Sequence, residues 1–215
     1  ATNDNVQQSS ADTPSVNLQP EESLSFDVGL KLDRSCLRAQ FYYFWMDIDD
    51  MILRTPAGSS GTTTLFSRSN RDAHLNGLEW AAQYDMMNGW SLYGNLSYYP
   101  GTDLERDEPL SRIPPTQGIL GLRWQDPEHR QYFDFYAWMS DRQDRLNFQD
   151  ISDKRIPAGG TPGFTTWNLR WSNRFTECQR ISLGIENLLD RAYRVHGSGV
   201  DGAGISANIG YESLF

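Results

Sequence analysis

The sequence predicts an all-β protein, and more narrowly a portion of an antiparallel, up-and-down transmembrane β-barrel with about nine strands. Apolar and polar residues alternate with a period of two in nine segments, whereas no segment shows a convincing helical stripe with a period of 3.6. Short and long connections also alternate strictly along the chain. Transmembrane barrels have this organisation, with short periplasmic turns and long extracellular loops.

The composition narrows the class of protein. A chain of 215 residues favours one domain or at most two. With 38% hydrophobic residues, it contains no apolar stretch long enough for a transmembrane helix. Its 7 Trp, 10 Tyr and 10 Phe residues argue against disorder, and its net charge of -9 argues against nucleic acid as a partner. These values leave a globular β or α/β domain, or a transmembrane β-barrel.

The expected elements follow one another from residue 23 to the end. Residues 1–22 are polar and contain two prolines, so we expect a tail or loop, with the barrel portion over 23–215. Many of the apolar faces carry Trp or Tyr near their ends, as in the aromatic girdles of membrane barrels. The nine expected strands are 24–32, 37–45, 78–84, 90–98, 120–124, 133–139, 167–171, 181–185 and 205–211.

The connections between these strands favour the membrane barrel over a soluble fold. Short links occur near 33–36, 85–89, 125–130 and 174–179, and long links near 49–72, 101–117, 141–164 and 188–203. The long links exceed the usual hairpin length of about 2–5 residues. A lipocalin-like or sandwich fold has no reason to place every long loop at one end, whereas a membrane barrel does.

The two cysteines lie in two of the short links. Cys36 and Cys178 are therefore predicted at the same rim, several strands apart. Because a disulfide requires Cα atoms within about 7 Å of each other, we expect both thiols to be unpaired.

Several segments resemble one known family when their order and spacing are considered together. They are QPEESLSFDVGLK (19–31), FYYFWMDIDDMI (41–52), NGLEWAAQY (76–84), WSLYGNLSYYPG (90–101), RIPPTQGILGLRW (112–124) and IENLLDRAYRVHGSGV (185–200). This set resembles the C-terminal β-barrel portion of TonB-dependent outer-membrane receptors. The last segment is the most specific, and the residues that match the family motif are Glu186, Asn187, Leu188, Asp190 and Tyr193.

The resemblance implies a role in transport. Such receptors import ferric siderophores or other scarce nutrients, and carry a plug domain and a TonB-contacting segment ahead of a barrel of twenty-two strands. This chain would then supply barrel wall and ligand-facing loops in the outer membrane, without catalysis or a cofactor. The implied partners are the lipid bilayer, the barrel assembly machinery, TonB through an N-terminal part outside this sequence, and a small-molecule ligand. Because the chain starts at Ala1, we expect a processed protein or a piece of a longer one.

The C-terminal residues resemble the signal that the barrel assembly machinery reads in the family. The resemblance places this signal on Phe215, Tyr211, Gly210 and Ile209. Ser213 stands where the family usually has an aromatic residue.

The residues that could carry chemistry do not form a recognisable set. His74, His129 and His196 lie on different segments without ligand spacing, so no metal site is predicted. The best catalytic combination is Ser198 and His196 with Asp190 or Asp201, all in one loop, whereas a triad needs groups held on separate rigid elements. We therefore expect no enzyme. The alternatives are a small independent outer-membrane barrel acting as an adhesin or enzyme, and a soluble ligand-binding β-barrel.

Overall fold

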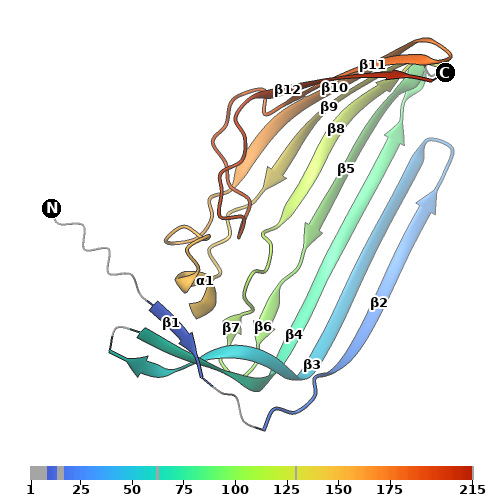
Figure 1. The fold of residues 1–215 in the computed structure, drawn as a ribbon. Coiled ribbons are helices and arrows are strands. Elements are labelled where there is room, and N and C mark those ends of the chain that lie inside the picture. Colours follow the sequence, from blue (N-terminus) through green and yellow to red (C-terminus); the bar gives the residue numbers. More distant parts are fainter. Residues whose placement is uncertain (1–8, 14–16, 62, 129, 215) are drawn as a thin grey trace.

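The computed structural model describes residues 9–13, 17–61, 63–128 and 130–214. Within them, nine strands form one continuous antiparallel sheet in which each strand pairs with the next (Figure 1). This confirms the predicted fold class. The nine strands are β2 (Glu22–Asp33), β3 (Leu37–Ser60), β4 (Thr63–Asp85), β5 (Trp90–Tyr98), β8 (Gln117–Gln125), β9 (Gln131–Ser140), β10 (Phe164–Thr176), β11 (Gln179–Glu186) and β12 (Ser206–Ser213).

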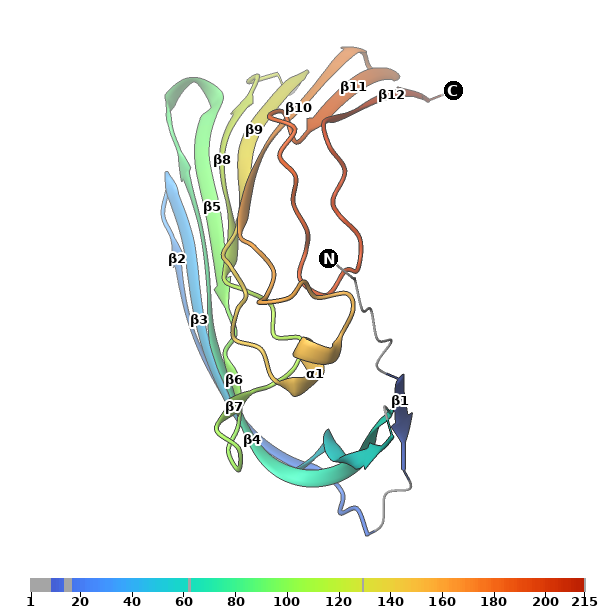
Figure 2. The ribbon, with the colours of Figure 1, turned by 90° about the vertical axis from the view of Figure 1, so that its left-hand side faces the viewer.

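The sheet is curved and open. Its path ends at β2 on one side and at β12 on the other, and these two strands do not pair with each other in the described part of the chain. Figure 2 shows the long connections on the concave side of the sheet. No helix among the described residues is long and apolar enough to cross a membrane.

One face of the sheet exposes large apolar side chains. On β2, Leu24 is 68% exposed and Leu30 is 70% exposed, and Ile209 on β12 is 77% exposed. The residues that alternate with this set point to the concave face, where Trp138 on β9 contacts a loop residue, Tyr193. An apolar face of this extent is unfavourable in water but suits the hydrocarbon core of a bilayer. It is the face expected to contact lipid.

The predicted long loop at 49–72 is wrong, because most of it is strand. β3 and β4 continue as one hairpin to its tip, pairing Met51 with Arg71 and Ser60 with Thr63. β3 contains two register shifts, between Ile48 and Met51 and between Pro56 and Gly58. The segment contains several Thr residues, which favour strands, and bulges bend a hairpin without ending it.

The expectation of no helix is also wrong. A single turn, α1 (Phe148–Ser152), forms within the connection between β9 and β10, and a 3₁₀ turn, η1 (Met87–Gly89), precedes β5. The Asn147 side chain accepts hydrogen bonds from the backbone N–H groups of Gln149 and Asp150, capping α1. One turn is too short to show a helical period in the sequence.

Three short strands complete the sheet. β6 (Gly101–Asp103) and β7 (Glu108–Pro109) form a small hairpin beside β4. β1 (Ser9–Asp12), which lies within the predicted tail, pairs with β4 in parallel. These strands all lie at the end of the sheet that carries the long connections (Figure 1).

The two ends of the sheet differ as predicted. The short turns between β2 and β3, β4 and β5, and β10 and β11 lie at one end, and the hairpin tip, β6, β7 and α1 lie at the other (Figure 1). Cys36 and Cys178 are exposed, free thiols in two of these short turns. The prediction that they are unpaired is confirmed.

The two thiols offer a test of which end faces the cell exterior. A maleimide that cannot cross membranes should leave Cys36 and Cys178 unmodified in intact cells and modify both after the outer membrane is permeabilised, because short turns of membrane barrels are periplasmic. As a control, Ser152→Cys in a chain lacking both native cysteines should be modified in intact cells. Mass spectrometry of the isolated protein measures both, and the reversed pattern would contradict this orientation.

Candidate functional site

The family-motif residues fix the two ends of the last long connection. Asn187 follows β11 directly, is 2% exposed and has a left-handed backbone with φ of 53°. Its side-chain amide donates to the carbonyls of Arg191 (2.9 Å) and Ala203 (3.0 Å), and its side-chain oxygen accepts from the N–H of Arg191 (2.9 Å). Its own N–H donates to Asn168 on β10 (3.0 Å). One side chain thus joins both ends of the loop to each other.

Asp190 makes a second connection across the loop. Its Oδ1 accepts a hydrogen bond from the N–H of Ile205 at 2.9 Å, just before β12 begins. A Cβ atom at Gly204 would lie 2.5 Å from the same oxygen, so the close approach requires glycine. Glu186 pairs with Ser206 at the end of the β11–β12 ladder, and the N–H of Leu188 donates to the carbonyl of Trp167.

Tyr193 holds the loop against the concave wall. Its ring centroid lies 4.7 Å from that of Phe164 and 5.9 Å from that of Trp138. Its carbonyl accepts from the N–H of Gly202, and a side chain at that glycine would overlap the tyrosine ring. The motif residues therefore position a loop along the concave face (Figure 2).

Replacing Asn187 should loosen this loop. Asn187→Ala removes three hydrogen bonds worth about 1 kcal/mol each, so we expect the loop to open about 2–3 kcal/mol more easily and amide exchange over 188–205 to accelerate. Hydrogen–deuterium exchange with mass spectrometry measures this effect. The exposed Asn208 on β12 provides the control: Asn208→Ala should leave exchange in the loop unchanged. Equal protection in both variants would contradict the assigned role.

A buried carboxylate organises the concave wall at mid-sheet. Asp134 on β9 is 2% exposed and accepts hydrogen bonds from the hydroxyls of Tyr93 and Tyr132, both at 2.8 Å. Arg123 on β8 lies 3.5 Å from the same carboxylate and places its guanidinium 4.5 Å from the centre of the Tyr93 ring. The network joins β5, β8 and β9. Sequence reasoning missed it, although Tyr93, Arg123 and Asp134 all alternate with the outward apolar residues.

A pocket of about 500 Å³ lies between the end of the β3–β4 hairpin and the α1 segment. The side chain of Gln149 on α1 joins the two sides of the pocket, because it donates a hydrogen bond to the carbonyl of Arg54 at 2.7 Å. The guanidinium of Arg54 lies 3.9 Å from the centre of the Phe66 ring, and this ring stacks on Phe148 at 6.1 Å. Because the sequence analysis predicts a loop rather than a hairpin at 49–72, it does not predict this pocket. Its charged lining residues are Arg54, Arg112, Asp150, Asp153, Lys154 and Arg155.

The pKa values of the two carboxylates in this pocket are shifted in opposite directions. Asp153 accepts from Arg155 at 2.6 Å and lies 3.7 Å from Arg112; the Arg155 hydrogen bonds lower the pKa of Asp153 to about 2. Burial raises the pKa of Asp150, although the backbone N–H groups of Arg112 and Asn147 oppose this shift. Burial lowers the pKa of His196, whose Nδ1 lies 2.9 Å from the Thr161 hydroxyl.

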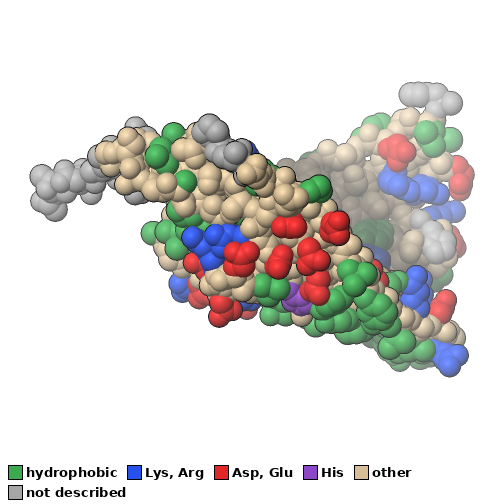
Figure 3. All heavy atoms as spheres, turned by 90° about the horizontal axis from the view of Figure 1, so that it is seen from below, with side chains coloured by type: hydrophobic (Ala, Val, Ile, Leu, Met, Phe, Trp, Pro, Cys, Tyr) green, Lys and Arg blue, Asp and Glu red, His purple; other side chains and the backbone are tan. Residues whose placement is uncertain are grey.

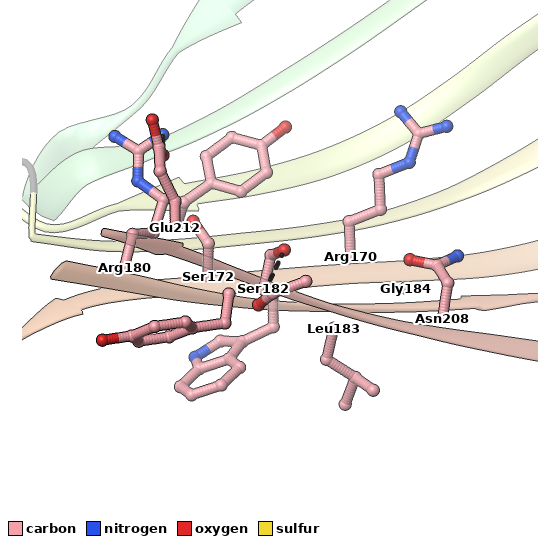
Figure 4. A pocket seen from close by; sticks show the side chains of 12 residues that line it. Arg170, Ser172, Arg180, Ser182, Leu183, Gly184, Asn208 and Glu212 are labelled. Atoms are coloured by element: carbon pink, nitrogen blue, oxygen red, sulfur yellow. Dashed lines mark hydrogen bonds and ion pairs between the residues drawn. The ribbon is translucent and has the colours of Figure 1, made fainter. Parts of the chain in front are cut away.

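A second pocket crosses β10, β11 and β12 near the opposite end and has a volume of about 450 Å³. Figure 4 shows Arg170, Arg180 and Asn208 on one side of the sheet and Leu183 on the other. Arg180 forms an exposed ion pair with Glu212 at 3.8 Å, which contributes little to stability. This pocket is a groove across the edge of the open sheet.

The structure does not bring the candidate catalytic residues together. Ser198 donates to the carbonyl of Val200, Asp201 pairs with Arg194, and Asp190 is occupied by the backbone of Ile205. His196 contacts Thr161 rather than Ser198.

The other residues singled out from the sequence are separated as well. His74 lies 2.7 Å from Asp47 on the neighbouring strand, and His129 lies outside the described residues. Among the residues that are described, no three His, Cys, Asp or Glu side chains are grouped to hold a metal ion.

The residues of the predicted assembly signal lie at the C-terminal end. Ile209, Gly210 and Tyr211 lie on β12, and Phe215 falls outside the described residues. Their role as an assembly signal stays a prediction.

The family model described as TonB dependent receptor-like, β-barrel, matches residues 1–188. The chain belongs to this family. The predicted resemblance to TonB-dependent receptors is therefore confirmed, as is the outer-membrane location. This location decides against the soluble barrel that the sequence had left open.

Solved structures of other proteins contain the same fold. The copper transporter OprC matches with a TM-score of 0.80 and 23% identity over 93% of this chain. The FrpB iron transporter from Neisseria meningitidis matches with a TM-score of 0.72 and 14% identity over 94%. The ferripyoverdine receptor of Pseudomonas aeruginosa matches with a TM-score of 0.67 and 12% identity over 91%. This chain covers 31%, 32% and 27% of those chains, respectively, or about a third of their length.

Proposed function

We propose that the chain forms part of the wall of an outer-membrane receptor that imports a scarce nutrient, such as a ferric siderophore or a metal ion, without catalysis. The observation that carries the proposal is the two-faced sheet of a TonB-dependent receptor barrel. Its apolar outward face suits lipid, and its polar concave face holds loops and a pocket at one end. The similar solved structures include proteins described as a copper transporter, an iron transporter and a ferripyoverdine receptor.

The proposal includes the partners that such a role requires. The outward face would contact the outer-membrane bilayer, and the last strand would be read by the barrel assembly machinery. TonB would act through a segment outside these 215 residues. The ligand would reach the concave face from the end that carries the long connections.

Deletion of the gene tests this proposal. Under metal limitation, cells that lack the gene should lose uptake of at least one ferric chelate or of copper, measured with radioactive metal. The gene should restore uptake in the deletion strain but not in a strain that also lacks TonB. Unchanged uptake of every supplied metal form, or restoration without TonB, would contradict the proposal.

A further inference from the structure

The pocket between the hairpin end and α1 has a charge opposite to that of the chain. The chain carries 19 basic and 28 acidic residues. The pocket is lined by four cationic side chains, Arg54, Arg112, Lys154 and Arg155, against two carboxylates. Figure 3 shows acidic side chains gathered on the same end of the molecule, beside a smaller cationic group. The pocket is thus a local positive region on an acidic protein.

The two carboxylates do not neutralise these cations. Arg112 and Arg155 converge on one carboxylate, Asp153, whose low pKa keeps a single negative charge between two positive ones. Asp150 is buried, and its Oδ1 accepts the backbone N–H of Arg112 at 3.0 Å. Lys154 forms no ion pair with any described residue. Positive charge is therefore available to an incoming anion.

One side of the pocket is held in place by the contacts of Arg54. Arg54 lies flat against Phe66 and pairs with Asp12 at 2.7 Å, and its carbonyl is bound by Gln149. Stacking on Phe66 and the contacts of Nε (2.8 Å) and Nη2 (2.7 Å) with Asp12 fix this guanidinium and balance its charge. This wall of the pocket therefore does not have to rearrange when an anion binds. The positive charge left for an anion comes from Arg112, Lys154 and Arg155.

The position and size of the pocket favour a dissolved ligand over a lipid. Both α1 and the curled end of the hairpin lie on the concave side, away from the apolar face (Figure 2). A volume of about 500 Å³ falls within the range of about 300–1,000 Å³ that is typical of small-molecule sites. We infer that this pocket binds a small organic anion with more than one negative charge, such as a carboxylate chelate of a metal ion. This inference rests on the proposed receptor function and names its ligand class.

The test uses the protein as its gene encodes it, purified from outer membranes in detergent, with ferric citrate as the probe. Titration calorimetry should show saturable binding. Arg112→Gln together with Lys154→Gln should weaken binding about tenfold or more, because two exposed cations are removed from the pocket. The matched control, Arg34→Gln with Arg130→Gln, removes two exposed cations from short turns at the opposite end and should leave affinity unchanged. Heat-modifiable gel mobility checks that each variant is folded.

A second measurement needs no variant. Affinity of the unmodified protein for ferric citrate should fall as salt rises from low to physiological concentration, because screening weakens charge–charge attraction. Any one of three results would overturn the inference: no saturable binding, an affinity that does not depend on salt, or equal weakening in the two double variants. Loss of metal uptake on gene deletion without ferric citrate binding would leave the receptor function standing and remove only the anion site. Binding of ferric citrate without any effect of gene deletion on uptake would support the anion site and contradict the receptor function.

Discussion

Residues 1–215 produced alone are expected to give no nutrient uptake above background, while the protein encoded by the complete gene restores it. The reason is the open sheet, in which β2 and β12 are unpaired edges within the described residues. In lipid, each backbone group without a hydrogen-bond partner costs several kcal/mol, so an open edge of about ten residues is prohibitive.

Closure of the nine strands on themselves would not rescue transport. A ring of about this size has an interior that side chains fill, and the concave face carries bulky Tyr93, Tyr136 and Trp138. The measurement compares radioactive metal uptake in cells that make the short chain and cells that make the complete protein, at matched outer-membrane levels. TonB-dependent uptake by cells with the short chain alone would show that these residues are sufficient.

Asp134→Leu is expected to lower the stability of the folded barrel by about 3 kcal/mol. The substitution leaves the hydroxyls of Tyr93 and Tyr132 and the guanidinium of Arg123 without their acceptor. Each donor that is left buried and unpaired costs about 1–3 kcal/mol, more when it is charged. Urea-dependent loss of the compact gel form, measured on the complete protein, reports the change.

Two variants make this result specific. Asp134→Asn keeps an acceptor oxygen and should lose less stability than the leucine variant. Glu177→Leu replaces an exposed carboxylate in the short turn between β10 and β11, and should change stability by less than about 0.5 kcal/mol. Equal effects at positions 177 and 134 would mean that the hydrogen-bond network contributes nothing.

The strands of the sheet could be predicted because alternation is a local signal. Each of the nine expected segments falls in or overlaps a strand of the continuous sheet. The signal failed at the end of the β3–β4 hairpin, where two register shifts in β3 interrupt the alternation. It also failed for α1, where an asparagine cap supports one turn without a repeating pattern.

The candidate pocket could not be predicted, because it combines residues that are far apart in the sequence. Arg54 and Gln149 are 95 positions apart and meet only after the hairpin curls beneath α1. The Asp134 network depends on strand register, which places Arg123 directly opposite Asp134. Alternation assigns each residue to a face, but it does not state which residue of the next strand lies beside it.

The loop between β11 and β12 contains residues that its structure requires and a position that is open to substitution. Asn187 and Asp190 close its base, and Tyr193 anchors one side against the wall. At the far tip, a Cβ atom at Gly197 would meet no heavy atom within 4 Å, so only its φ of 75° restricts a substitution at this position, whereas His196 beside it is held by Thr161. Related chains are therefore expected to differ at open positions of this loop such as Gly197, and to keep the residues that close its base.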